Sequence, residues 1–202
     1  MSYNELVLIA LRHLVDRARH PRTRADELAR LRVRHQAQPS AHQVDRERVA
    51  LASELRRLRR ALAAELEHAD VQSCHGCARG HPLPAGRWAG GHCCGGNTLE
   101  IFSATEVAAL KLAGTTPRDW KPPRDEHAGC AFRGHDGCSL PPEDRPTICL
   151  RYICLELREE LKSRGQQPVF ELAAALRDAQ ERFAALEDDH FSSSSMPRSF
   201  HK

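Results

Sequence analysis

The sequence predicts a mainly α-helical protein: a helical hairpin or coiled-coil arm, a small cysteine-rich metal-binding module with a short β-hairpin, and C-terminal helices. Three observations lead to this fold class. Outside the middle of the chain, apolar residues recur at intervals of three and four, as on one face of a helix. Aromatic residues make up only 5% of the 202 residues, too few to fill one large core. All eight cysteines lie between Cys74 and Cys154.

Composition argues against several classes of protein. No apolar stretch approaches the roughly 18 residues that a membrane-spanning helix needs. The formal net charge of +3 is too small to indicate a nucleic-acid-binding protein. The first residues lack the basic and apolar regions of a secretory signal, so we expect a cytoplasmic protein. The excess of arginine over lysine and the many alanines are typical of a GC-rich bacterial genome.

Residues 1–73 form the predicted helical or coiled-coil region. The pattern predicts a first helix over residues 4–19 and a second over residues 23–35. A third and longer helix is expected over residues 40–69. A polar linker that contains a proline separates the second helix from the third.

The third helix is expected to begin at the capping-box sequence Ser40–Gln43. It carries a leucine seam with one polar interruption, Arg48; the seam residues are Val44, Leu51, Leu55, Leu58 and Leu62. Such a seam must be buried, either in an antiparallel hairpin packed on the module or in contact with a protein partner or second copy through residues 44–62. The basic run Arg56–Arg60 is expected to face solvent.

Regular structure is also predicted between and after the cysteines. We expect a short strand over residues 98–102 and a helix over residues 103–114 that begins with a second capping box. A tight hairpin is predicted over residues 130–140, because an Asp-Gly pair favours a two-residue turn. This turn would place His135 opposite Cys138.

The C-terminal helices are assigned to residues 155–190 and are expected to pack on the module. One helix is predicted from Pro146, which suits a first helical position, to Gly165. A last amphipathic helix is predicted over residues 168–188. Residues 191–202 are expected to be a disordered tail.

Residues 74–154 form the predicted metal-binding domain. Disulfides are rare in a reducing cytoplasm, so clustered cysteines indicate metal binding or redox chemistry. The spacing Cys74-x2-Cys77 lets both thiolates reach one ion. The adjacent Cys93–Cys94 lies between glycine pairs that would allow a ligand loop.

The last two cysteines differ in their expected surroundings. Five residues along one helix turn the side chain by about 500°, which would hold Cys149 and Cys154 roughly 140° apart around the axis. They are therefore not expected to share one tetrahedral ion. Cys149 follows Pro146 in a first helical turn, where the helix dipole favours a thiolate. Cys154 also fits a buried apolar position.

The order of these motifs resembles the YkgJ family, a zinc- or iron-chelating domain named for its CxxCxxCC motif. The resemblance covers residues 74–154 and rests on Cys74-x2-Cys77, Cys93-Cys94, Cys130-x-Phe132, Gly137-Cys138 and Arg145-Pro146-x2-Cys149. It implies a small cysteine-rich metal domain. A related domain in bacterial flagellin lysine methylases implies an iron–sulfur centre as one option. Fifteen residues separate Cys77 from Cys93, more than the family usually has, which marks a divergent member.

The predicted metal ligands are the eight cysteines, Cys74, Cys77, Cys93, Cys94, Cys130, Cys138, Cys149 and Cys154, with His75 and His92 as candidate additional ligands. Four thiolates suit zinc and equally a 4Fe–4S or 2Fe–2S cluster. Eight allow two centres, or one centre with spare thiols.

The favoured function is metal binding, with the helices mediating self- or partner association. An iron–sulfur redox or methyltransferase-accessory enzyme is one alternative, and a nucleic-acid-binding zinc protein is another. The sequence contains no phosphate-binding glycine loop, nucleophile elbow or HExxH helix, so we lean against an enzyme.

Overall fold

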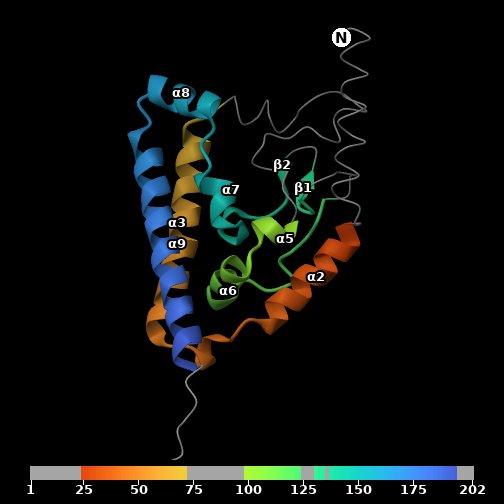
Figure 1. Ribbon diagram of the computed structural model, residues 1–202. Helices are drawn as coiled ribbons and strands as arrows, with labels where there is room; N and C mark the ends of the chain where they lie inside the picture. The colour runs from red at the N-terminus through yellow and green to blue at the C-terminus, as the bar shows by residue number, and fades with distance from the viewer. Residues whose placement is uncertain (1–23, 72–97, 124–129, 135–136, 195–202) are drawn as a thin grey trace, which may run out of the picture.

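A computed structural model describes residues 24–71, 98–123, 130–134 and 137–194. These residues are mainly helical (Figure 1), which confirms the predicted fold class at that level. The predicted first helix, residues 4–19, lies outside them. The elements are α2 (Arg24–Ala37), η1 (Ala41–Gln43), α3 (Arg46–His68), α5 (Thr98–Ile101), α6 (Ala104–Leu112), β1 (Arg133–Gly134), β2 (Gly137–Cys138), η3 (Pro142–Asp144), α7 (Thr147–Arg151), α8 (Leu155–Ser163) and α9 (Gln167–Ser194).

The two longest helices, α3 and α9, lie side by side and antiparallel (Figure 1). Leu51, Leu55, Leu58 and Leu62 of the seam are buried in one core with Leu176 and Phe183 of α9. Ion pairs join the two helices at Arg48–Glu187 and Glu54–Arg182. The chain's own last helix therefore covers the seam, and no contact with another chain through residues 44–62 is needed to bury it.

The N-cap of helix α3 lies five residues later than the predicted cap, Ser40. Its N-cap is Asp45, whose Oδ1 accepts a hydrogen bond from the Arg48 amide at 2.8 Å. Residues Ser40–Gln43 instead form a separate turn, in which the Gln43 side chain accepts from the Ser40 amide at 2.8 Å. A carboxylate at the N-terminus of a long helix also interacts favourably with the helix dipole, which favours the later start.

Replacing Asp45 with alanine should lower the free energy of unfolding by about 1 kcal/mol, because the first turn of α3 loses its cap. Ser40→Ala is the matched control, since Ser40 precedes the separate turn Ala41–Gln43 and is not the N-cap of α3. Urea unfolding followed by circular dichroism measures both changes. Equal losses for the two variants would contradict the assigned helix start.

Helix α6 is buried on nearly every side and separates two cores. Ala108, Ala109 and Leu112 pack into the core between α3 and α9. Val107 and Leu110 pack into a second core with Leu28 and Leu31 of α2 and with Phe102, Trp120 and Phe132. The predicted start is confirmed, because the Ser103 hydroxyl accepts from the Glu106 amide at 3.2 Å. The described residues of the 74–154 segment thus share both cores with the flanking helices.

The predicted strand over residues 98–102 is wrong, because Thr98–Ile101 form the short helix α5. Arg34 of α2 donates from Nη1 to the carbonyl oxygens of Leu99 and Phe102, both at 2.6 Å. Carbonyl groups at a helix end need such donors. A distant residue thus stabilises a helix that local propensity does not indicate.

The antiparallel pairing of β1 with β2 has a different register from the one expected. Arg133 lies opposite Cys138, and Gly134 lies opposite Gly137. The two residues between the strands are therefore 135 and 136, one position earlier than the predicted turn. The amide of Ser139 continues the ladder by donating to the Phe132 carbonyl at 2.9 Å. His135 lies outside the described residues.

The predicted helix from Pro146 to Gly165 is interrupted. Helix α7 ends at Arg151, Tyr152 is extended, and Cys154 is the N-cap of α8. The expected angle between Cys149 and Cys154 therefore does not apply, since no single helix carries both.

Helix α9 continues to Ser194, beyond the predicted end at residue 188 and into the expected tail. Of the helices described, none combines the length and apolar character needed to cross a membrane.

Candidate metal centre

Four of the eight predicted cysteine ligands lie in the described part of the chain: Cys130, Cys138, Cys149 and Cys154. The other predicted ligands lie outside it, namely Cys74, Cys77, Cys93, Cys94, His75 and His92. No disulfide joins the four described cysteines. Among the described residues, no three His, Cys, Asp or Glu side chains lie close enough together to hold a metal ion.

Cys130 and Cys138 lie beside the second core. Cys130 is buried, Cys138 is half-buried, and both pack against the apolar cluster that contains Phe132. The residue after Cys130 is held in place, because the Ala131 amide donates to the Thr98 hydroxyl at 2.8 Å. That hydroxyl donates in turn to the buried carboxylate of Glu27 on α2. Helices α2 and α5 therefore fix the backbone beside the first of these thiols.

Cys149 lies in the first turn of α7, and several elements hold the start of that helix. The Thr147 amide donates to Glu106 Oε1 of α6 at 3.0 Å. The Thr147 hydroxyl donates to Gln180 of α9 at 3.0 Å and accepts from Arg59 of α3 at 3.1 Å. Helices α3, α6 and α9 thus converge on a residue two positions before Cys149.

Arg59 is the centre of this buried hydrogen-bond network and is fully buried. Its Nη2 lies 2.9 Å from Glu106 Oε2. Burial lowers the pKa of Arg59, while the negative charges of Glu106, Asp144 and Cys149 act in the opposite direction. Within the described structure, Nε and Nη1 of Arg59 have no hydrogen-bond acceptor.

Unsatisfied buried donors are rare in proteins and call for an explanation. A thiolate centre that includes Cys149 would supply negative charge close to this guanidinium. A negative charge on Cys149 raises the pKa of Arg59 and so opposes the effect of burial.

Arg59 is buried, whereas the sequence pattern predicts that the basic run Arg56–Arg60 faces solvent. The position of Arg59 contains the missing signal. It follows Leu55 by four residues and precedes Leu62 by three, so it lies on the same helix face as the seam. Glu106 lies three residues after the N-cap Ser103, where the capping-box pattern alone accounts for a glutamate.

A second group of polar contacts fixes the segment before α7. Arg56 donates to the Ala113 carbonyl at 3.1 Å, and its Nη1 lies 3.4 Å from Asp144 Oδ1. Asp144 is buried and accepts from the Thr115 hydroxyl at 2.6 Å. Arg60 lies 2.9 Å from Glu143 Oε1. Arginines of α3 therefore anchor η3, which leads directly into the helix that carries Cys149.

Cys154 has a distinct local role. Its sulfur accepts a hydrogen bond from the Leu157 amide at 3.4 Å and caps the N-terminus of α8. The side chain also packs against the core between α3 and α9. Cys130 and Cys138 pack against the second core, so Cys154 belongs to a different core from these two cysteines.

His35 of α2 is a buried titratable group next to the second core. Its Nε2 lies 3.0 Å from the Thr115 carbonyl oxygen, and its ring packs edge-on to Trp120 with centroids 5.2 Å apart. Burial lowers the pKa of His35. The hydrogen bond to Thr115 acts in the opposite direction, and the Lys111 charge lowers the pKa further.

Acidification should therefore destabilise the protein through His35. In the unfolded chain the pKa returns to about 6.5, so the unfolded state binds more protons as the pH falls through that value toward the folded pKa. The melting temperature should fall between about pH 7.5 and about 5.5 more steeply in the wild type than in His35→Gln. His42→Gln is the control, because His42 is exposed. An equal dependence of the melting temperature on pH in all three proteins would contradict a destabilising role of His35.

Comparisons with known proteins do not assign a family or a function to the chain. No family model, curated protein or solved structure matches the chain. The resemblance to the YkgJ family therefore rests on the cysteine motifs themselves.

Proposed function

We propose that this protein binds zinc or an iron–sulfur cluster through the clustered cysteines of residues 74–154. The observation that carries the proposal is the confinement of all eight cysteines to this segment, with Cys74-x2-Cys77 as its first chelating pair. The buried guanidinium of Arg59 near Cys149, with two donors that lack an acceptor in the described residues, supports an anionic group there.

The ligands proposed are Cys74, Cys77, Cys93, Cys94, Cys130, Cys138 and Cys149, with Cys154, His75 and His92 as further candidates. Zinc would cross-link the segment, whereas an iron–sulfur cluster would in addition transfer electrons. In this proposal, contacts from other helices fix the backbone next to the ligands Cys149 and Cys130. Glu106 and Arg59 hold the start of α7, and Thr98 holds the residue after Cys130.

An iron–sulfur redox or methyltransferase-accessory enzyme is the second candidate function. The observation that favours it is the surplus of thiols over the four that one zinc ion needs. The relatedness of the YkgJ domain to one in flagellin lysine methylases agrees with this alternative. Iron content and an absorption spectrum distinguish it from a structural zinc protein.

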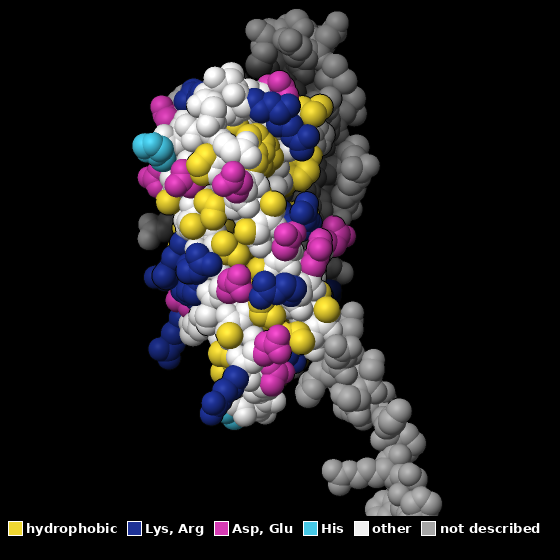
Figure 2. Space-filling model, turned by 90° about the vertical axis from the view of Figure 1, so that its left-hand side faces the viewer, with side chains coloured by type: hydrophobic (Ala, Val, Ile, Leu, Met, Phe, Trp, Pro, Cys, Tyr) yellow, Lys and Arg dark blue, Asp and Glu magenta, His cyan; other side chains and the backbone are white. Residues whose placement is uncertain are grey.

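A nucleic-acid-binding role through Arg56–Arg60 is not supported. Arg59 is buried against Glu106, and Arg56 and Arg60 contact Asp144 and Glu143. On the α9 side of the molecule, basic and acidic side chains are interleaved with hydrophobic ones (Figure 2). That face therefore lacks the continuous basic surface that binding to a phosphate backbone requires.

Metal analysis of protein purified anaerobically without chelator tests the proposal. We expect at least one equivalent of zinc or iron per chain, and a visible absorption band if the metal is an iron–sulfur cluster. Less than one equivalent, with the thiols paired as disulfides, would refute metal binding.

Two cysteine variants make the test specific to the site. Cys77→Ser should lose metal and lower the melting temperature, because metal binding contributes directly to folding. Cys154→Ser is the matched variant, since serine is itself a good N-cap and preserves the start of α8. Retention of metal by Cys154→Ser shows that Cys154 is not a required ligand, and equal retention by Cys77→Ser contradicts the proposed ligand set.

A further inference from the structure

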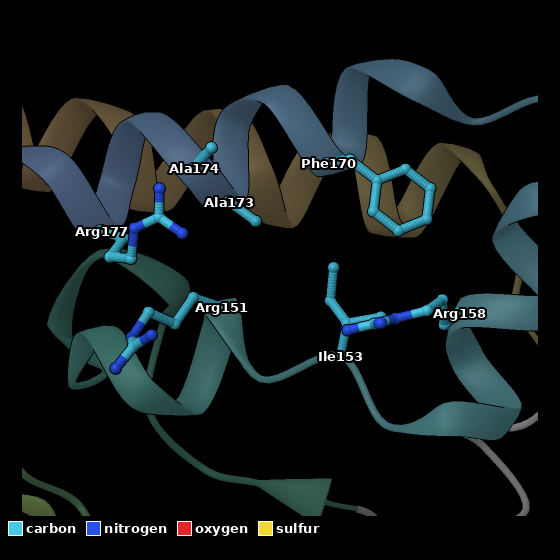
Figure 3. Close-up of a pocket in the computed structure, with 7 residues that line it drawn as sticks. All are labelled: Arg151, Ile153, Arg158, Phe170, Ala173, Ala174 and Arg177. Atoms are coloured by element: carbon cyan, nitrogen blue, oxygen red, sulfur yellow. The ribbon is translucent and has the colours of Figure 1, made fainter.

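A small hollow lies between α9 and the connection from α7 to α8 (Figure 3). Its volume is about 210 Å³, and three arginines line it together with apolar side chains of α9 and the connection. Phe170 of α9 and Ile153 of the connection point toward one another across it. Arg151 and Arg177 lie at one end, and Arg158 lies at the end with Phe170. We call this site the arginine hollow.

The cations of the arginine hollow have little compensating negative charge. Arg151 and Arg158 form no ion pair with any residue that the structure describes. Arg177 lies 3.0 Å from Asp178 and 3.8 Å from Glu181, but all three side chains are exposed. Exposed ion pairs of this kind contribute only about 0–1 kcal/mol, so Arg177 can exchange these partners for another anion.

Three large apolar side chains on α7, α8 and the connection between them are exposed. Ile148, Tyr152 and Leu155 are 41%, 46% and 77% exposed, and all three belong to α7, α8 or their connection. Within the described residues, the other large hydrophobic side chain that is similarly exposed is Val33. Aromatic residues and arginine are enriched in protein–protein interfaces, so exposed side chains of both kinds near the hollow favour a protein partner.

The size of the hollow argues against a small organic ligand. Pockets that enclose small molecules measure roughly 300–1,000 Å³. A volume of about 210 Å³ with exposed apolar neighbours instead suits one anchoring side chain of a larger molecule. Asp178 and Glu181 next to Arg177 disfavour an extended phosphate backbone, whereas a peptide can place its carboxylates at the arginines alone.

We propose that the arginine hollow binds an acidic segment of a partner protein, which inserts one apolar side chain between Phe170 and Ile153. Carboxylates on either side of the anchor would pair with Arg151, Arg158 and Arg177. Tyr152 and Leu155 would extend the apolar contact. This site is independent of the metal proposal, since it uses no predicted ligand.

Fluorescence anisotropy with the full chain and synthetic peptides tests this inference. The probe is a labelled peptide of about 12 residues, rich in Glu and with one central Phe. We expect it to bind at least about tenfold more tightly than the same peptide with Ser in place of Phe, and a Lys-rich counterpart should not bind. Absence of binding by the acidic Phe peptide up to about 1 mM would overturn the proposal.

Charge reversal locates the binding site on the protein. Arg151→Glu combined with Arg158→Glu should weaken binding by about tenfold or more, since two attractive charges become repulsive. Arg182→Glu is the matched control on α9, because Arg182 is exposed and lies outside the hollow. Equal loss in both variants would indicate a non-specific charge effect and overturn the proposal.

Two further probes separate the peptide from other anions. Single-stranded DNA or inorganic phosphate should compete poorly with the acidic Phe peptide at moderate salt. If either one binds as tightly and loses binding in the double variant, the hollow is a general anion or nucleic-acid site, and the proposal is wrong. Metal content measured in the same preparations shows that any lost binding does not come from a lost centre.

Discussion

Replacing Arg59 with methionine is expected to lower the free energy of unfolding by about 3–5 kcal/mol, the usual cost of removing one partner of a buried ion pair. Arg59 is fully buried, and its Nη2 lies 2.9 Å from the buried carboxylate of Glu106. Without the guanidinium, Glu106 is left as a buried charge without its cationic partner. Thr147 also loses the donor to its hydroxyl oxygen. Urea unfolding followed by circular dichroism measures the change.

A double variant distinguishes the ion pair from simple packing. Arg59→Met combined with Glu106→Leu removes both charges, so it should be more stable than Arg59→Met alone. It also removes the acceptor of the Thr147 amide, which should keep it below the wild type. Arg60→Met is the matched control, because Arg60 is mostly exposed and its pair with Glu143 should contribute at most about 1 kcal/mol. A loss in Arg59→Met no larger than in Arg60→Met would contradict the buried network.

The long helices could be predicted from sequence because their signals are local. The seam from Leu51 to Leu62 repeats within one helix, and Ser103 caps α6 three residues before Glu106. The burial of Arg59 was also accessible, since its spacing from Leu55 and Leu62 places it on the seam face. A run of charged residues usually faces solvent, and that general rule predicts the wrong environment for Arg59. A position on a helix face is the stronger indicator when the flanking leucines are themselves buried.

The bounds and contacts of several short elements could not be predicted, because the local sequence pattern does not reveal what decides them. Helix α5 depends on Arg34, which supplies donors to carbonyl groups 65 and 68 residues further on. The start of α7 at Pro146 agrees with the prediction, but the contact that holds it comes from Glu106, 41 residues before Thr147. The break before α8 uses the Cys154 sulfur as a cap, although cysteine is not among the preferred N-cap residues.

The candidate site also combines features that the sequence reveals with features that only the tertiary structure reveals. The residue types and the order of the cysteines are visible in the sequence, and they lead to the metal proposal. The support around them is not visible, because Glu27, Thr98 and Ala131 come from three separate segments. Local pattern therefore identifies candidate ligands, whereas tertiary contacts determine which backbone positions are fixed. The arginine hollow likewise forms only because α7 and α8 separate where one continuous helix was expected.

Replacing Phe183 of α9 with alanine should destabilise the protein by about 3–5 kcal/mol, the usual cost of truncating a buried phenylalanine. Phe183 is fully buried in the core that contains the leucines of the α3 seam. The Arg48 guanidinium also lies 5.7 Å from the centre of its ring, so a cation–π contact is lost with the ring. Thermal and urea unfolding measure the loss.

The same variant tests what covers the seam. If α9 of the same chain buries Leu51 to Leu62, truncation of Phe183 must open a cavity in that core, and the loss must be large at every protein concentration. Val33→Ala is the control, because Val33 is exposed on α2 and its truncation should change stability by less than about 0.5 kcal/mol. A Phe183→Ala effect as small as the control would mean that another surface, such as the seam of a second copy, buries these leucines. Because the ion pairs Arg48–Glu187 and Glu54–Arg182 join the same two helices, we expect the large loss.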